Sequence, residues 1–225
     1  MCVLVLFYTT IMLDKKRIAI FIDGGNFHHL VIKKLMISEL DFNFEQFVLF
    51  LVQEEKIVDK WKRYYVGTVR EKEGDEYSKQ SMSRQNKFFS ELKKENWQLR
   101  TNKLKTRIEK IIVDARMQNY EKLKSINIQE IVYERKREKG IDVMLAIDLI
   151  VGAVEDIYDM AIIVSSDADL LPAIEWIRKT KNKQVMYVGF SIQNNNNASK
   201  PLYSMIVNTD IQRVLVETDL KCFIK

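Results

Sequence analysis

Apolar residues occur along this chain in short continuous runs, too short for helices, that are separated by polar residues and glycines. Residues 17–22 (RIAIFI) are such a run and end at Asp-Gly-Gly, as is typical of a strand buried on both faces of a sheet. Residues 63–69 are rich in aromatic and β-branched residues, and residues 97–101 alternate as a strand does. The pattern predicts strands over residues 17–22, 63–69, 97–101, 160–164, 184–188 and 214–216.

Segments with apolar residues at helical spacing lie between these strands. Asn26 is a plausible N-cap for a helix that continues to about Met36. Asn43, with Gln46 three residues later, resembles a capping box at the start of another helix. Residues 102–133 mix the helix and strand periods and predict either a hairpin or a helical insertion. Further helices are predicted over residues 77–96, 141–154 and 171–180.

This alternation of strands and helices predicts an α/β fold, in which helices flank a mostly parallel sheet with right-handed crossovers. A length of 225 residues suits one such domain, which we expect to span residues 15–217 and to be followed by a C-terminal tail, 218–225. Residues 1–14 are an apolar extension. Either residues 3–7 form an extra edge strand, or the native chain begins at Met12.

Charge is distributed unevenly along the chain. The net charge is +5, but residues 60–140 hold 22 Lys and Arg against 12 Asp and Glu, a net charge of +10. The remaining residues hold 14 against 19, a net charge of −5. A basic middle region beside acidic ends indicates one surface that attracts polyanions and another that gathers carboxylates. Helices with solvated lysine faces would explain the basic region equally well.

Cysteine and histidine content excludes several classes of site. Cys2 and Cys222 lie at opposite ends of the chain and form neither a disulfide framework nor a zinc pattern, which indicates a reducing compartment, so we expect a cytoplasmic protein. His28 and His29 are adjacent and point in different directions on a helix, which argues against a His-based metal site. The apolar residues 1–13 are too short to span a bilayer and lack signal-peptide features, so we expect no membrane contact.

Four acidic residues follow strands or begin a helix at the edge where open parallel sheets place their active sites. Asp23 follows the first strand, Asp142 begins an apolar helix, and Asp167 and Asp169 follow the strand at 160–164. Each has a structural alternative, since an Asp in a turn accepts backbone N–H groups or caps a helix. Capping needs only one of Asp167 and Asp169, however, and two like charges so close repel unless a cation intervenes. We therefore expect a metal site, and oxygen-only ligands select Mg²⁺ or Mn²⁺.

Two polar residues accompany this cluster. Asn26 lies three residues after Asp23, where it can cap a helix or hold a carboxylate or a water through its side-chain carbonyl. Asp148 lies six residues after Asp142, about 120° around the predicted helix, and is expected to have an orienting or structural role.

Three blocks of the sequence resemble the signature blocks of NYN domains. They are FIDGGN at 21–26, EKGIDVMLAIDL at 138–149 and SSDADLLP at 165–172, and they occur in the family's order. The closest fit is the LabA-like bacterial branch, within the PIN-like nuclease superfamily. The resemblance covers residues 15–215, nearly the whole chain.

The resemblance implies a Rossmann-like, PIN-like sheet with a Mg²⁺- or Mn²⁺-dependent ribonuclease site. Asn26 would orient Asp23, and Ser165 and Asp148 are the other candidates for positioning the site. Ser166 stands where this block often has glycine, so its Cβ limits close backbone approach. The catalytic and metal-binding residues would be Asp23, Asp142, Asp167 and Asp169.

The working hypothesis is an endoribonuclease that cleaves phosphodiester bonds in single-stranded or looped RNA. Tyr64, Tyr65 and Trp97 could stack bases, although aromatic residues in strands usually belong to the core. A homodimer is a possible assembly. Candidates for phosphate contacts are the basic residues Lys103, Lys105, Arg107, Arg135, Lys136, Arg137 and Lys139.

Two other classes of function compete with this hypothesis. The chain could be a non-catalytic RNA- or protein-binding module of the same fold, whose carboxylates only cap helices and turns. It could also be a phosphatase or nucleotide hydrolase of the haloacid-dehalogenase type. Those enzymes place a second Asp two residues after the first, however, where this chain has Gly25.

Overall fold

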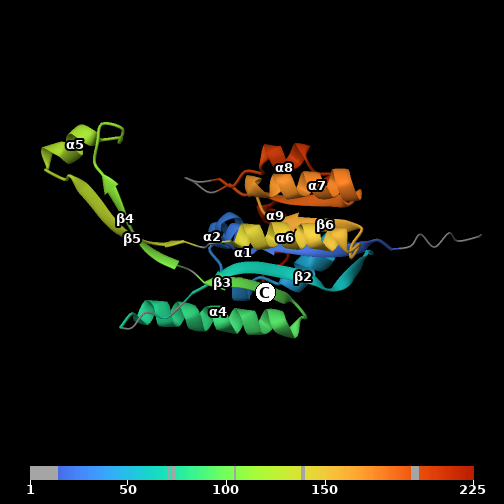
Figure 1. The fold of residues 1–225 in the computed structure, drawn as a ribbon. Helices are drawn as coiled ribbons and strands as arrows, with labels where there is room; N and C mark the ends of the chain where they lie inside the picture. Colours follow the sequence, from blue (N-terminus) through green and yellow to red (C-terminus); the bar gives the residue numbers. More distant parts are fainter. Residues whose placement is uncertain (1–14, 70, 72–73, 104, 138–139, 194–197) are drawn as a thin grey trace, which may run out of the picture.

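A six-stranded sheet with the strand order β3-β2-β1-β6-β7-β8 forms the centre of the molecule (Figure 1). The computed structural model describes residues 15–69, 71, 74–103, 105–137, 140–193 and 198–225. All neighbouring strands of this sheet run parallel, which confirms the predicted α/β fold. The strands are β1 (Arg17–Asp23), β2 (Lys56–Thr68), β3 (Gln98–Lys103), β6 (Met160–Val164), β7 (Gln184–Ser191) and β8 (Ile211–Val216).

Helices cover both faces of the sheet because successive strand residues point to opposite sides. Ile20 and Ile22 of β1 join one core cluster, while Ala19 and Phe21 join the other. The first cluster packs under α1 (Gly24–Phe27), η1 (His28–Ile32), α2 (Lys33–Leu35), α3 (Phe44–Val52), α4 (Glu76–Lys94) and α9 (Glu217–Lys221). The second packs under α6 (Ile141–Val154), α7 (Leu171–Lys181) and α8 (Tyr203–Val207).

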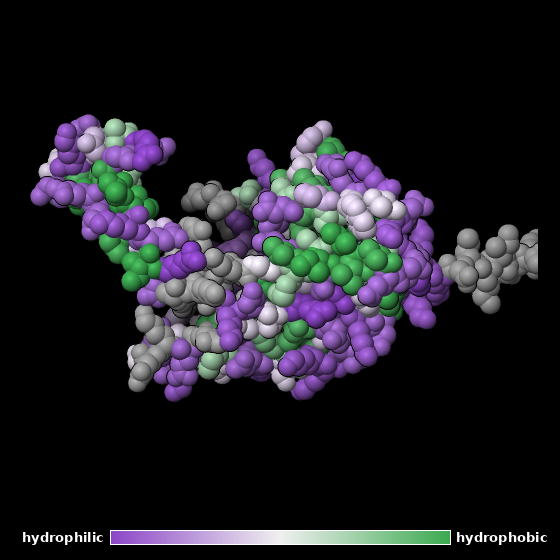
Figure 2. Space-filling view, viewed as in Figure 1, coloured by the Kyte–Doolittle hydropathy of each residue, from purple (hydrophilic) through white to green (hydrophobic). Residues whose placement is uncertain are grey.

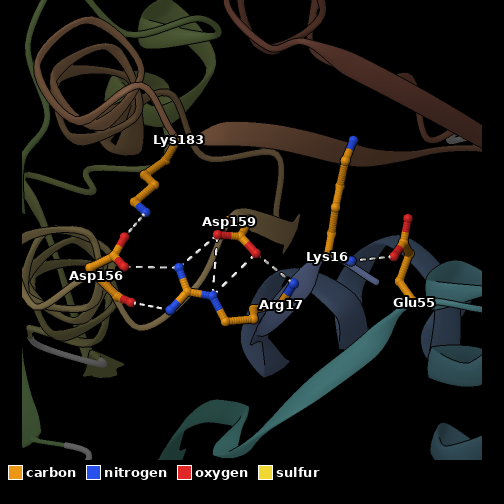
Figure 3. Close-up of polar contacts among 6 residues, drawn as sticks. All are labelled: Lys16, Arg17, Glu55, Asp156, Asp159 and Lys183. Atoms are coloured by element: carbon orange, nitrogen blue, oxygen red, sulfur yellow. Dashed lines mark hydrogen bonds and ion pairs between the residues drawn. The ribbon is translucent and has the colours of Figure 1, made fainter. Parts of the chain in front are cut away.

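The amino end of β1 is held by a polar network on Arg17 (Figure 3). The Arg17 guanidinium donates to Asp159, with Nη2 2.7 Å from Oδ1, and it also reaches the carboxylate and carbonyl of Asp156. Lys183 pairs with the same Asp156 carboxylate. This network raises the pKa of Arg17 and lowers that of Asp159 through their mutual hydrogen bonds. The network fixes the amino end of this central strand, whereas Asp23 lies at its carboxyl end.

A two-stranded antiparallel ribbon projects from the sheet beyond the carboxyl end of β3 (Figure 1). It consists of β4 (Lys105–Ile112), α5 (Tyr120–Ser125) and β5 (Glu130–Arg137), and we call it the arm. The two alternatives left open for residues 102–133 are thus both present, as a hairpin that carries a short helix between its strands. Ile108, Ile112 and Val132 are 77%, 67% and 54% exposed, so no core imposes one hydrophobic period on the arm.

The C-terminal residues, predicted as a tail, belong to the core instead. Leu220 and Phe223 are buried, and the Phe223 ring lies 5.5 Å from that of Phe47. Ile224 also forms a β-bridge with Phe42. Phe223 packs against aromatic side chains of α3, because its ring also lies 5.5 Å from that of Phe50. The predicted edge strand at residues 3–7 and the alternative start at Met12 lie outside the described residues.

The outer face of α6 carries exposed apolar side chains, which form the apolar patch over this helix in Figure 2. Val143, Ile147 and Val154 are its most exposed members. No described helix combines the length and the apolar character needed to cross a lipid bilayer. Tyr65 and Trp97 are buried in the core and do not present rings for base stacking, whereas the equally buried Tyr64 lies at the wall of a cavity described below.

Candidate active site

Asp23 lies at the carboxyl end of β1 and caps the helix that follows. Its Oδ1 accepts the backbone N–H of Asn26 at 3.0 Å, so the helix begins at Gly24. The N-cap is therefore Asp23, and the prediction that Asn26 caps this helix was wrong. Gly24 is required by packing, because a Cβ at this position would lie 2.5 Å from Cε1 of Tyr64. The Asp-Gly-Gly sequence thus folds a carboxylate tightly against the end of a buried strand.

Asn26 connects the ends of β1 and β6. Its side-chain Nδ2 donates to Oδ2 of Asp23 at 2.9 Å, and its Oδ1 accepts the backbone N–H of Ser166 at 3.3 Å. The structure therefore places Asn26 where it holds Asp23, but the contact is made by the amide nitrogen rather than by the carbonyl. The carbonyl instead secures the loop that carries the next acids.

Ser165 joins the same network from the end of β6. Its Oγ donates to Oδ2 of Asp23 at 3.0 Å and accepts the backbone N–H of Asp167 at 3.2 Å. Asp167 in turn accepts the backbone N–H of Asp169 at 2.9 Å and caps η3 (Ala168–Leu170). One member of the acidic pair therefore has a capping role, which leaves the carboxylate of Asp169 without one.

Asp142 approaches the cluster from the first turn of α6. The N-cap of this helix is Gly140, which adopts a left-handed conformation with φ of +77°, so Asp142 is not the cap that the sequence suggested. No described residue donates a hydrogen bond to the Asp142 side chain, which is partly buried. Its carboxylate therefore has a position set by α6 alone.

The charges of neighbouring acids affect the pKa values of Asp23 and Asp142. Burial is the main cause that raises the pKa of Asp23, and the charge of Asp167 adds to it, while hydrogen bonds from Asn26 and Ser165 oppose it. The pKa of Asp142 is raised to about 6, first by burial and then by the charges of Asp23, Asp167 and Asp169. The carboxylates therefore concentrate negative charge at the carboxyl ends of the strands. Among the described residues, no cationic side chain pairs with Asp142.

The donor chemistry of this cluster suits Mg²⁺ or Mn²⁺, because all its side-chain ligands are oxygens. Within the described part of the chain, however, no three His, Cys, Asp or Glu side chains are grouped so that they could hold one metal ion. Asp23 is held by its three hydrogen bonds, whereas the exposed Asp169 is free of such bonds among described residues. Ion binding would thus require the outer carboxylates to turn toward Asp23.

Asp148 lies in a different network. It accepts a hydrogen bond from Tyr65 Oη at 2.8 Å and pairs with Arg63 at 2.8 Å and Arg100 at 3.1 Å. The other acids are not among its described partners. These contacts tie α6 to β2 and β3, so they support the structural role, and an orienting role toward the acids stays a prediction.

The predicted RNA contacts lie on and beside the arm. Lys103 ends β3, and Arg107 is exposed on β4. Lys139 lies outside the described residues. For the others the structure describes the backbone alone, within β4 or β5, and they are Lys105, Arg135, Lys136 and Arg137.

One polar pair near the site was not predicted. Nδ1 of His28 lies 2.5 Å from Oε1 of Glu39, and the hydrogen bond to Glu39 raises the pKa of His28. The two residues are eleven apart in sequence and belong to different elements. No local pattern could have revealed their contact.

Comparisons with known proteins agree with this architecture. A family model described as "NYN domain" matches residues 17–205. The fold is also similar to the crystal structure of a protein of unknown function from Vibrio parahaemolyticus, with a TM-score of 0.54 and 18% identity, over 90% of this chain and 94% of that one. No curated protein matches the chain.

Proposed function

This chain belongs to the NYN domain family, and on that premise we propose that it is a metal-dependent endoribonuclease that cleaves phosphodiester bonds in RNA. The LabA-like branch, to which its sequence blocks are most similar, is part of the same proposal. One observation carries it. At the carboxyl ends of the strands, the charges of Asp23, Asp167 and Asp169 all raise the pKa of Asp142, and the buried Asp23 is held in place by Asn26 and Ser165.

Each residue of the cluster has a defined task in this proposal. Asp23 and Asp167 would hold the metal, while Asp142 and Asp169 would complete its coordination or hold a second ion. Bound Mg²⁺ or Mn²⁺ would activate water and offset the charge that develops on the phosphate. Asn26 and Ser165 fix the Asp23 carboxylate, so that it is oriented before the substrate arrives.

The arm supplies the proposed path for RNA. It leaves the body after Lys103 at the end of β3 and returns just before α6, whose first turn carries Asp142. A strand of RNA that follows the basic residues at the base of the arm would therefore arrive beside the acids (Figure 1). Contacts of this kind bind the phosphate backbone without reading sequence.

The decisive experiment is cleavage of labelled single-stranded RNA by the wild-type protein and by Asp23→Asn, with and without Mn²⁺. We expect internal cleavage by the wild type in Mn²⁺ only, and none by the variant.

The non-catalytic binding module is favoured by one observation, that no described group of side chains already forms a metal site. RNA binding by both proteins without metal-dependent cleavage would support that alternative. A homodimer and a cytoplasmic location stay predictions, and sedimentation equilibrium would measure the first.

A further inference from the structure

A cavity of about 450 Å³ lies between α4 and the helical turns that follow β1. Its wall includes the backbone of Gly24 and Gly25, directly after Asp23. Its volume lies within the range of small-molecule sites, about 300–1,000 Å³. We call it the α4 pocket, and the residues that matter for its chemistry are Gly24, His28, Arg84, Phe88 and Phe89.

Aromatic rings form one part of this wall. Tyr64 and Phe88 are buried, Phe89 is half-buried, and the rings of Phe88 and Phe89 are 6.1 Å apart. The bare Cα of Gly24 brings its backbone against Tyr64, where any Cβ would clash. A pocket lined by aromatic side chains suits a flat aromatic ligand.

The polar groups of the pocket include two hydrogen-bond donors. His28 lines the pocket and uses Nδ1 in its pair with Glu39, so Nε2 takes no part in that pair. Arg84 lies on α4 and forms no ion pair with a residue that the structure describes. By contrast, both ends of the Gln85 side-chain amide already form hydrogen bonds. Its Nε2 donates to the carbonyl of Gly67, and its Oε1 accepts the backbone N–H of Val69. A ligand with acceptor atoms at its edge would satisfy His28 and Arg84.

The pocket and the acidic cluster share one turn of the chain. Asp23 interacts electrostatically with Asp142 and Asp167, and the next two residues line the pocket. His29, another residue that lines the pocket, interacts electrostatically with Asp23. Burial is the main cause that lowers the pKa of His29, and the negative charge of Asp23 opposes that change. A nucleotide whose phosphate lies at the acids would therefore have its base beside this pocket.

We propose that the α4 pocket receives one unstacked base of single-stranded RNA next to the phosphodiester bond that is cleaved. This inference rests on the proposed function and deepens it by giving the site a preference among bases. Proteins read splayed RNA bases by stacking them on aromatic side chains and by bonding their edges. Two donors favour a purine, and guanine matches best because it presents both O6 and N7 as acceptors to Arg.

The substitutions that fill the pocket lie on α4, apart from the acids. Ser81 lines the pocket from α4, whereas Ser83, two residues along the same helix, is exposed and outside it. Ser81→Trp and Ser83→Trp therefore form a matched pair. Their binding to a fluorescein-labelled single-stranded RNA would be measured by anisotropy in an Asp167→Asn background, which is expected not to cleave. Stacking of one base corresponds to about a fivefold to hundredfold change in affinity, and we expect Ser81→Trp alone to show a loss of this size.

A second series identifies the base. In this series one nucleotide of the RNA, at a different position in each oligonucleotide, lacks its base. For the Ser83→Trp variant, affinity should fall when the missing base is the one that occupies the pocket. For the Ser81→Trp variant, whose pocket is already filled, loss of that base should cause no further fall in affinity. Arg84→Gln, which removes the guanidinium from the exposed rim of the pocket and keeps a polar side chain there, should reduce the preference for guanine at that position. Melting temperatures of all variants establish that they are folded.

The outcomes separate this inference from the proposed function. The base pocket would be overturned if the two Trp variants bound RNA with equal affinity, even if the wild type cleaves RNA. It would also be overturned if Ser81→Trp bound more weakly than Ser83→Trp by the same factor wherever the abasic nucleotide stands. Failure of the wild type to cleave in Mn²⁺, with the Trp contrast intact, would instead refute the nuclease and keep the pocket as part of an RNA-binding module.

Discussion

Asn26 and Asp23 are joined twice, once through the Asn26 backbone N–H to Oδ1 at 3.0 Å and once through the side-chain Nδ2 to Oδ2 at 2.9 Å. Both oxygens of a buried carboxylate are thereby held by one residue three positions along the chain. The same Asn26 side chain accepts the N–H of Ser166, which lies 140 residues later. Asn26 is thus a positioning residue that couples the two strand ends carrying the acids.

Replacing Asn26 by Ala should remove both side-chain bonds and leave buried polar groups unsatisfied. We expect a loss of about 1–3 kcal/mol in the free energy of unfolding and a fall in kcat that exceeds any change in KM. Asn43→Ala is the control, because Asn43 caps α3 by accepting the N–H of Gln46 at 3.0 Å, away from the site. It should cost about 1 kcal/mol and leave kcat unchanged. Full kcat in Asn26→Ala would remove the positioning role.

Asp167→Asn should abolish Mn²⁺-dependent cleavage without weakening the apo fold. Asn can still accept the N–H of Asp169, and the variant loses a charge that repels Asp23 and Asp142. We expect cleavage to fall by at least about a hundredfold, with an unchanged or higher melting temperature in EDTA. Asp219→Asn is the control, since Asp219 also accepts a backbone N–H, from Val216. A drop of several degrees for Asp167→Asn would identify Asp167 as a structural cap only.

Mn²⁺ or Mg²⁺ should stabilise the wild-type protein, because an ion would relieve the repulsion among the acids. At a hundred times the dissociation constant the gain is about 2.7 kcal/mol, which corresponds to about 5–10 °C in a domain of this size. A thermal-shift titration measures it, and Asp142→Asn should reduce it. Equal shifts in the wild type and in Asp23→Asn would place the ion elsewhere.

Charge reversal at the base of the arm should weaken RNA binding for all sequences. We expect the double variant Lys103→Glu, Arg107→Glu to flatten the dependence of log K on log salt by about 1–2. Lys56→Glu with Lys181→Glu makes the same change in net charge on exposed residues at the opposite edge of the sheet. Identical salt slopes for the two double variants would exclude the arm from the RNA path.

The His28–Glu39 pair should make stability depend on pH at both ends of a window. The bond to Glu39 raises the pKa of His28, although burial and Lys33 oppose it, so its contribution is lost as pH rises above about 6.5 through the folded pKa. Burial raises the pKa of Glu39, but the hydrogen bonds from His28 and from the backbone, together with the charge of His28, lower it by more. The pair therefore also weakens as pH falls below about 4.5. The melting-temperature difference between wild type and Glu39→Gln should therefore be largest between these values. A difference independent of pH would contradict the ion pair.

Local patterns were sufficient for the elements that a core imposes. The continuous apolar run of β1 and the long apolar segment of α6 are local features of the sequence, and residues 141–154 form the predicted helix to the residue. The mixed period of residues 102–133 could not decide between strand and helix, because the arm packs on no core. Residues 218–225 read as a tail because only the distant apolar face of α3 makes Phe223 a core residue.

The sequence by itself determined the parallel α/β sheet, the family and the edge at which Asp23, Asp142, Asp167 and Asp169 gather, since strand ends follow from periodicity and chain order. Only the tertiary structure decided that Asp23 is the helix cap, that Asp148 pairs with arginines, and that a pocket opens beside Gly24. These features depend on contacts between residues far apart in the chain, and the geometry of such contacts is set by packing rather than by local pattern.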